Sequence, residues 1–275
     1  MLLERYELLL SVEGDNDPLW KSPARGALMH GALHALARAD NLHSGSNSAR
    51  PYSQHLLPIG HKRYCWILNV LHRDSCMPIL EWLDTQPDHV RVSHYDIGLA
   101  VDRIECTISQ SYFDFQQRWL DDIPPKFVRL NFLTPTAFKR AGDPNYYLWP
   151  DAKMVVQSAL SRWNLFGTAS KLDDPAILED VVKHVHVQSY QLISRYAAMD
   201  GIGFSGSVGT IAYQIHKNTA VRQVFNLAAA YAEYCGLGIK TAMGLGAIEY
   251  ERRESIHKKH GTTHHKETQS REVPG

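Results

Sequence analysis

The chain has 275 residues, of which 44% are hydrophobic, and it carries 29 basic and 29 acidic side chains. A net charge of zero counts against a generic nucleic-acid binder, for which a basic domain is the usual footprint, although it is compatible with a local basic face. No apolar run reaches the roughly 18 residues that a membrane-spanning helix needs, and the N-terminal stretch MLLERYELLL is interrupted by charges, unlike a signal peptide. The length favours two domains with buried cores.

The four cysteines are widely scattered, and no two of them are spaced as Cys-x-x-Cys. This spacing indicates neither a zinc site nor a disulfide framework, so we expect buried, reduced thiols in a cytoplasmic protein. The 15 histidines are numerous, and histidine side chains can transfer protons near neutral pH.

The first half alternates strand and helix patterns. Compact apolar runs bounded by turn residues predict strands, and apolar residues spaced three or four apart predict helices. In chain order these are a strand at 5–13, a helix at 24–39, a strand at 64–71, a helix at 75–83 and one or two strands within 90–110. This order favours a ferredoxin-like domain over residues 1–120, followed by an acidic, proline-bearing linker at 121–126.

The second half repeats this architecture without an obvious sequence repeat. Its predicted elements are a strand at 127–132, a helix at 150–165, paired strands at 190–196 and 204–215, a helix at 219–234 and a short strand at 247–250. We therefore expect an α+β protein of two tandem ferredoxin-like domains (βαββαβ, RRM-like), the second over residues 127–250. Residues 251–275 are polar without apolar periodicity, which predicts a disordered tail.

Three histidines in and after the first predicted helix are candidate reactive groups. His30 and His34 are four residues apart and share a helix face, but Gly31 stands where a His-Glu-x-x-His zinc motif needs glutamate. We therefore interpret this pair as a partly exposed helix surface. His43 lies in a polar loop at 41–53. Loops on rigid scaffolds commonly carry catalytic groups, although a single loop histidine is more often simply solvated.

The most distinctive segment is Gly236–Gly246, in which four glycines enclose Lys240 and Thr241. Backbone amides in such a loop can approach phosphate oxygens while the lysine supplies charge. A P-loop is excluded because the lysine does not follow the required glycine. A dinucleotide fingerprint needs the order strand–loop–helix, which is reversed here. A loop that clasps a nucleic-acid backbone and a glycine-capped turn without ligand both remain.

The stretch AYAEYCGLGIKTAMGLGAIEY resembles the C-terminal signature of the Cas6 family of CRISPR-processing endoribonucleases. That signature is a helix, a loop of the form Gly-φ-Gly-x-Lys-Thr-x-x-Gly-φ-Gly, where φ is an apolar residue, and a strand. Upstream, a helix beginning Arg-Gly, a Leu-His pair, a polar loop and a Pro-aromatic pair are similar to the N-terminal region of the family. The segments TPTAF and GFSGSVGTIAY extend the resemblance over residues 1–250.

This resemblance implies metal-independent cleavage of CRISPR-repeat RNA, without a cofactor. The 2′-hydroxyl beside the scissile phosphate would attack it, leaving a 2′,3′-cyclic phosphate and a 5′-hydroxyl. Some family members carry a lysine shortly after the histidine, whereas the next lysine here is Lys62, so Arg25 or Arg50 would replace it.

The resemblance and the residue chemistry together assign the site. His43 occupies the position of the family's proton-transfer histidine, Arg25 would stabilise charge, and His30 is a second candidate. Candidate RNA-binding residues are the glycine loop and a basic group of the second domain, namely Gly236, Gly238, Lys240, Thr241, Gly244, Gly246, Arg129, Lys139 and Arg140.

Two other functions stay open. A non-catalytic RNA-binding subunit of a CRISPR effector complex would not need His43. A small-molecule enzyme with a nucleotide cofactor would need a strand before Gly236 and an acidic residue about 20 positions further on, where the chain nearly ends. Besides CRISPR RNA, effector-complex subunits and a second copy of the chain are candidate partners, and a membrane is not.

Overall fold

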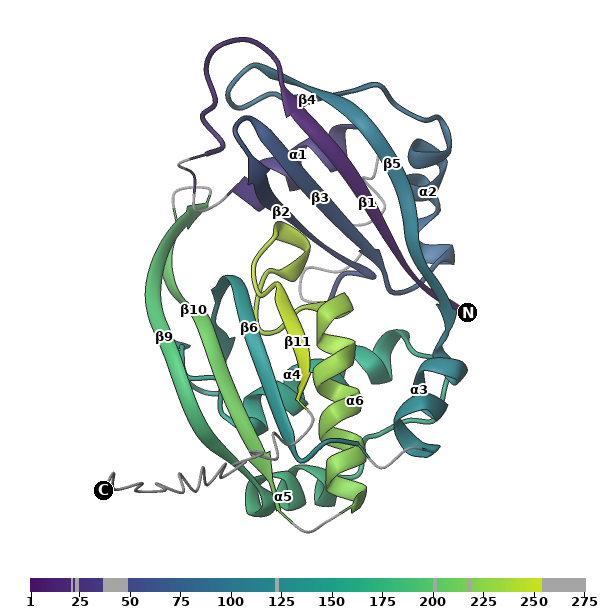
Figure 1. Ribbon diagram of the computed structural model, residues 1–275, viewed down its shortest axis with the longest axis vertical. Coiled ribbons are helices and arrows are strands. Elements are labelled where there is room, and N and C mark those ends of the chain that lie inside the picture. Colours follow the sequence, from purple (N-terminus) through teal and green to yellow (C-terminus); the bar gives the residue numbers. More distant parts are fainter. Residues whose placement is uncertain are drawn as a thin grey trace, which may run out of the picture.

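The computed structural model describes residues 1–20, 22, 25–36, 49–121, 124–199, 202–216 and 219–253. These residues form two α+β units, one above the other in Figure 1. No helix among them is long and apolar enough to cross a membrane. Three of the four cysteines are buried as expected, whereas Cys106 is exposed.

The N-terminal unit is an antiparallel sheet in the order β2-β3-β1-β5-β4. Its strands are β1 Leu2–Val12, β2 Tyr52–Gly60, β3 Arg63–Val70, β4 His89–Val92 and β5 Ile97–Ser111. Without the short edge strand β4, this order is the ferredoxin-like arrangement. The predicted strand region 90–110 therefore contains two strands, whereas β2 was not predicted.

Two helices cover one face of this sheet, α1 Arg25–Leu36 and α2 Met77–Asp84, the latter preceded by the short 3₁₀ helix η2 Asp74–Cys76. Met29 and Leu33 of α1 are fully buried against apolar residues of the sheet, and burying side chains of this size contributes about 2 kcal/mol each. Pro78 at the beginning of α2 fits because a first-turn amide has no partner within the helix.

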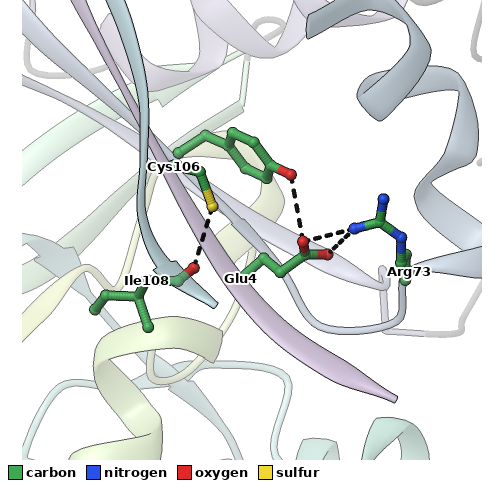
Figure 2. Close-up of polar contacts among 5 residues, drawn as sticks. Glu4, Arg73, Cys106 and Ile108 are labelled. Atoms are coloured by element: carbon green, nitrogen blue, oxygen red, sulfur yellow. Dashed lines mark hydrogen bonds and ion pairs between the residues drawn. The ribbon is translucent and has the colours of Figure 1, made fainter. Parts of the chain in front are cut away.

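A buried carboxylate fixes the beginning of β1. Glu4 is 3% exposed, and both of its carboxylate oxygens accept hydrogen bonds from one guanidinium nitrogen of Arg73, at 2.6 and 2.7 Å (Figure 2). The ion pair raises the pKa of Arg73. Because an unpaired buried carboxylate is costly, this contact ties β1 to the segment that leads into η2.

The C-terminal unit is a four-stranded antiparallel sheet in the order β11-β6-β10-β9. Its strands are β6 Phe127–Thr136, β9 Val185–Met199, β10 Ile202–Ile215 and β11 Ile248–Arg253. This is again the ferredoxin-like order, so the predicted fold class is confirmed. Residues 251–253 belong to β11, which corrects the predicted start of the tail, and 254–275 lie outside the described residues.

Four helices surround the C-terminal core: α3 Tyr112–Asp121, α4 Ala152–Phe166, α5 Pro175–His184 and α6 Thr219–Cys235. The predicted helix at 150–165 is α4, whose first turn is capped by the Asp151 carboxylate, 2.8 Å from the Met154 amide. Neither α3 nor α5 was predicted. α3 belongs to the residues assigned to the first domain, yet it packs into the second core. A small hairpin, β7 Phe138–Lys139 and β8 Tyr146–Tyr147, follows β6.

Candidate functional site

A cleft of about 380 Å³ lies between the two units. One wall is the beginning of α1 together with β2, and the other is formed by β6, β9 and β10, with the glycine loop beside them. Ligands commonly bind at such domain interfaces. The cleft is therefore the natural candidate site.

Two arginines contribute the charge of this cleft, Arg25 from α1 and Arg195 from β9. The Arg25 guanidinium donates to the backbone carbonyls of Ser22 and Trp20, at 3.0 and 3.3 Å. Within the described residues, neither guanidinium forms an ion pair with a carboxylate, and no acidic side chain lines the cleft. The cleft therefore presents two positive charges to a ligand, which suits an anion.

The glycine loop, residues 236–246, does not present the amide cradle expected from its sequence. The amides of Leu237, Ile239 and Gly246 donate to the carbonyls of Gly246, Ala137 and Pro135, respectively. The amide of Gly238 donates to the Ser158 hydroxyl at 2.8 Å. These donors are occupied within the protein, so they are unavailable to a phosphate.

The glycines instead allow the two units to approach each other closely. A Cβ atom on Gly26 of α1 would lie 2.6 Å from the Cα atom of Gly244. Gly244 itself has φ +84°, a conformation that L side chains rarely adopt. The contact therefore requires glycine on both sides.

A buried glutamine reinforces this contact. The Gln54 side-chain amide donates to the carbonyls of Gly26 and Ala242, at 2.6 and 3.1 Å, and its oxygen accepts from the Trp66 indole at 2.9 Å. Three bonds thus fix the orientation of this amide, and through it the position of α1 relative to the loop.

Lys240 and Thr241 differ within the loop. Lys240 is partly exposed, has φ 55° and precedes the 3₁₀ helix η3 Thr241–Met243. Thr241 is 6% exposed, and its Cγ2 atom would lie 2.7 Å from a Cβ atom on Gly236. Thr241 therefore packs inside the loop, and Lys240 is the polar side chain of the pair that reaches the surface.

The predicted basic group of the second domain is not a cluster. Arg129 lies on β6, seven residues before Thr136, the last residue of that strand, and so about 23 Å from this end of the strand. Its side chain pairs with Glu251 at 3.9 Å. Arg140 stacks on the Tyr147 ring, at 3.2 Å from its centroid, and lies 3.7 Å from Asp151.

Lys139 is the one member of that group beside the glycine loop. It lines a second cavity, of about 240 Å³, together with Gly238 and Ile239 of the loop and Ser161 of α4. The two cavities therefore contact different parts of the glycine loop, Gly244 in the cleft and Gly238 with Ile239 in the second cavity.

The histidines of α1 are partly exposed, as the sequence suggested, and both also contact β2. His30 Nδ1 and His34 Nε2 each lie 3.2 Å from the hydroxyl oxygen of Tyr52 on β2. His43 lies outside the described residues, so its predicted role stays a prediction.

Polar groups from the N-terminal sheet cap the C-terminal end of α6. The Arg5 guanidinium donates to the Glu233 carbonyl at 2.8 Å and lies 4.8 Å from the centroid of the Tyr234 ring. The Ser53 hydroxyl donates to the Tyr234 carbonyl. A cation at a helix C-terminus complements the helix dipole, so these contacts hold the two units in one orientation.

His55 lies in the same joint. Burial, and secondarily the charge of Arg5, lowers the pKa of His55 to about 3. This histidine is therefore neutral at physiological pH.

Sequence reasoning missed Arg195, Gln54 and Tyr52. The signal for Arg195 was available in the alternation of its strand. Leu192 packs against the core, and Arg195, three residues later, therefore lies on the opposite face of the strand.

Among the described residues, no group of three histidine, cysteine, aspartate or glutamate side chains could hold a metal ion.

Comparisons with known proteins agree with the architecture. The family model of CRISPR-associated endoribonuclease Cas6 matches residues 130–248. A curated relative, CRISPR-associated endoribonuclease Cas6 of Mycobacterium tuberculosis (strain H37Rv), is 24% identical over 256 residues, which cover 90% of this chain and 78% of the relative. The Cas6 of Streptococcus thermophilus is 24% identical over 128 residues, covering 46% and 52% of the respective chains.

Solved structures show the same fold. A product complex of Cas6 (TTHB231) superposes with a TM-score of 0.74 at 21% identity, covering 91% of this chain and 99% of that one. Thermus thermophilus Cas6 (TTHB231) gives 0.71 at 18% identity, covering 91% and 98%. Together with the sequence relatives and the matched family model, these structures show that the chain is similar to Cas6 proteins along most of its length and shares their fold.

Proposed function

We propose that this protein is an endoribonuclease that cleaves CRISPR precursor RNA within the repeat and so generates CRISPR RNA. Similarity to curated relatives that are named as endoribonucleases supports the reaction class. The observation that carries the proposal is the cleft between the two units, where Arg25 and Arg195 face a shared space without a carboxylate among the lining residues.

The proposed chemistry needs no bound metal. The 2′-hydroxyl beside the scissile phosphate attacks the phosphorus, which leaves a 2′,3′-cyclic phosphate and a 5′-hydroxyl. Arginine side chains stabilise the negative charge that develops on the phosphorane oxygens, a role that we assign to Arg25 with support from Arg195.

Proton transfer is assigned to His43, with His30 as the second histidine. A positioned histidine typically accelerates such a step by about 10²–10⁴-fold. His30 follows Arg25 by five residues, about 7.5 Å along the axis of α1, so both groups belong to the helix that forms one wall of the cleft.

RNA binding draws on lysines rather than on glycine amides. Lys240 lies on the loop and Lys139 lies beside it, so both would contact backbone phosphates near the loop. The glycines hold the loop against α1 and thereby set the width of the cleft. Phosphate contacts of this kind give affinity without sequence preference.

The test is a cleavage assay with the CRISPR-repeat RNA of the source genome, in EDTA. We expect wild type to cut once and to leave a 2′,3′-cyclic phosphate. A 2′-deoxy substitution at the cut should abolish cleavage, and His43→Ala should reduce it by at least about 100-fold while RNA binding persists. Arg25→Ala should likewise slow cleavage, and Arg103→Ala, on the exposed part of β5, is its matched control.

Three outcomes would overturn parts of this proposal. Binding without any cleavage by wild type would favour a non-catalytic subunit. Cleavage of the 2′-deoxy RNA would exclude attack by the 2′-hydroxyl. Cleavage by His43→Ala at a near-normal rate would leave the activity in place and move the proton-transfer role to His30.

A further inference from the structure

The second cavity, of about 240 Å³, lies between the helix α4, the strand β7 and the glycine loop. Its apolar lining residues are Phe138, Met154 and Ile239. Its polar lining includes the exposed side chains of Lys139, Gln157 and Ser161. Because sites for drug-sized ligands measure about 300–1,000 Å³, a cavity of this size suits one small ring system.

The polar groups of this cavity differ in what they still offer to a ligand. The Ser158 hydroxyl accepts a hydrogen bond from the Gly238 amide at 2.8 Å, and the Ser161 hydroxyl donates to the Ser158 carbonyl at 2.9 Å. Within the described part of the chain, the Gln157 side chain has no hydrogen-bond partner. Its amide offers both donors and an acceptor, so it can pair with the edge of a polar ring.

Two cations border the same space. Lys139 lines the cavity, and the Arg162 guanidinium donates to the carbonyl of Gly238, another lining residue, at 2.8 Å. Among the described residues, neither cation forms an ion pair with a carboxylate, and the cavity has no acidic lining residue. The positive charge is uncompensated, which favours an anion here.

We propose that the second cavity binds one nucleotide of the RNA and reads its base. The base would lie against Met154 and Ile239, with its edge at the Gln157 amide and its phosphate at Lys139. Proteins recognise single-stranded RNA in this way, by packing side chains against an unstacked base and hydrogen-bonding its edge. The inference rests on the proposed function, to which it adds Gln157 as a specificity-determining residue.

The glycine loop connects this cavity with the cleft. Gly238 lines the cavity and Gly244 lines the cleft, with Lys240 partly exposed between them. Six residues separate the two glycines, so their Cα atoms are at most about 22 Å apart, a span that a few nucleotides of single-stranded RNA cover. The base that Gln157 reads should therefore lie within a few nucleotides of the scissile phosphate.

The test is binding of an uncleavable 2′-deoxy repeat RNA in which each base near the cut is replaced in turn by the other three. At one position, wild type should prefer one base by about 10-fold, and Gln157→Ala should bind all four within about twofold. Base preferences at other positions should stay unchanged. Gln157 is exposed on a helix, where alanine is well tolerated. Gln117→Ala, on α3 and outside both cavities, is the matched control.

The phosphate contact is tested by the salt dependence of the same binding. Lys139→Ala should weaken binding of all four bases equally and reduce the slope of log affinity against log salt by about 0.7. Lys153→Ala, an exposed lysine of α4 outside both cavities, should leave that slope unchanged.

Two results would overturn the inference. Gln157→Ala could keep every base preference of wild type, which would exclude base reading in the cavity. Alternatively, free nucleoside 5′-monophosphates could bind wild type as tightly as the RNA does, by calorimetry, which would assign the cavity to a free nucleotide. If wild type cut no RNA but lost one base preference in Gln157→Ala, the proposed function would fail and the base-reading cavity would stand.

Discussion

The glycine loop and the arginine-bearing walls of the cleft differ in how far their sequences reveal their roles. The loop has the composition of a phosphate-binding element, yet its amides at Leu237, Gly238 and Ile239 are occupied by protein acceptors. Arg195 belongs to no sequence motif, and Arg25 is marked only by its resemblance to an arginine at the start of a helix. Both nevertheless face an open cleft. The loop determines geometry, and the walls supply charge.

This difference separates two kinds of mutation. Changes in the loop or in the joint around α6 should alter stability and the relative position of the two units. Changes to the arginines of the cleft should alter affinity for RNA and leave stability almost unchanged, since exposed charges contribute little to folding.

The largest expected effect is that of Gly26→Ala on stability. The new Cβ atom would lie 2.6 Å from the Gly244 Cα atom, and backbone on both sides cannot yield cheaply. We expect a loss on the order of 3 kcal/mol in the free energy of unfolding, measured in urea.

Gly31→Ala is the matched control for that variant. Gly31 lies on the same helix, is exposed, and has no atom within 4 Å of an added Cβ. Alanine there should stabilise the protein by about 0.5–1 kcal/mol, because glycine is a poor helix former. Equal effects at the two positions would contradict the close backbone contact.

The overall architecture was predictable from sequence because it depends on local periodicity. The alternating and compact apolar runs gave most strands of both sheets, and Pro150 and Asp151 located the beginning of α4 within two residues. The miss at β2 has a clear cause, since Pro51, Tyr52 and Ser53 directly follow a long polar stretch and look like its continuation.

The site was less predictable because it depends on contacts between distant segments. Arg195 and Arg25 line the same cleft only because β9 lies at the edge of one sheet and α1 packs against the other. The same holds for Tyr52, which reaches His30 and His34 through the pairing of β2 with β3. The glycine loop misled because positive φ and close packing require glycine as strictly as a phosphate site does.

A further expected effect, confined to acid pH, concerns the joint. The pKa of His55 is lowered to about 3 in the folded protein by burial, so between that value and the ordinary histidine value the unfolded chain binds more protons than the folded one. Stability should therefore fall as the pH is lowered through this window. Between pH 6.5 and 4, the His55 contribution to this loss is about 3 kcal/mol.

Urea unfolding of His55→Gln across the same pH range measures that contribution. The variant should lose less stability on acidification than wild type, whereas His94→Gln, on an exposed turn, should follow the wild-type curve. Identical acid sensitivity in His55→Gln and wild type would show that His55 is not held neutral in the joint.

The central claim, that RNA lies in the cleft and is bound by its arginines, is tested most directly by binding of an uncleavable 2′-deoxy repeat RNA over a range of salt concentrations. Arg195→Ala should weaken binding and reduce the slope of log affinity against log salt by about 0.7, the value for one phosphate contact on a single strand. Arg103→Ala, equally a loss of one positive charge but outside the cleft, should leave the slope unchanged. Equal slopes for Arg195→Ala and wild type would contradict the account and place the RNA elsewhere on the protein.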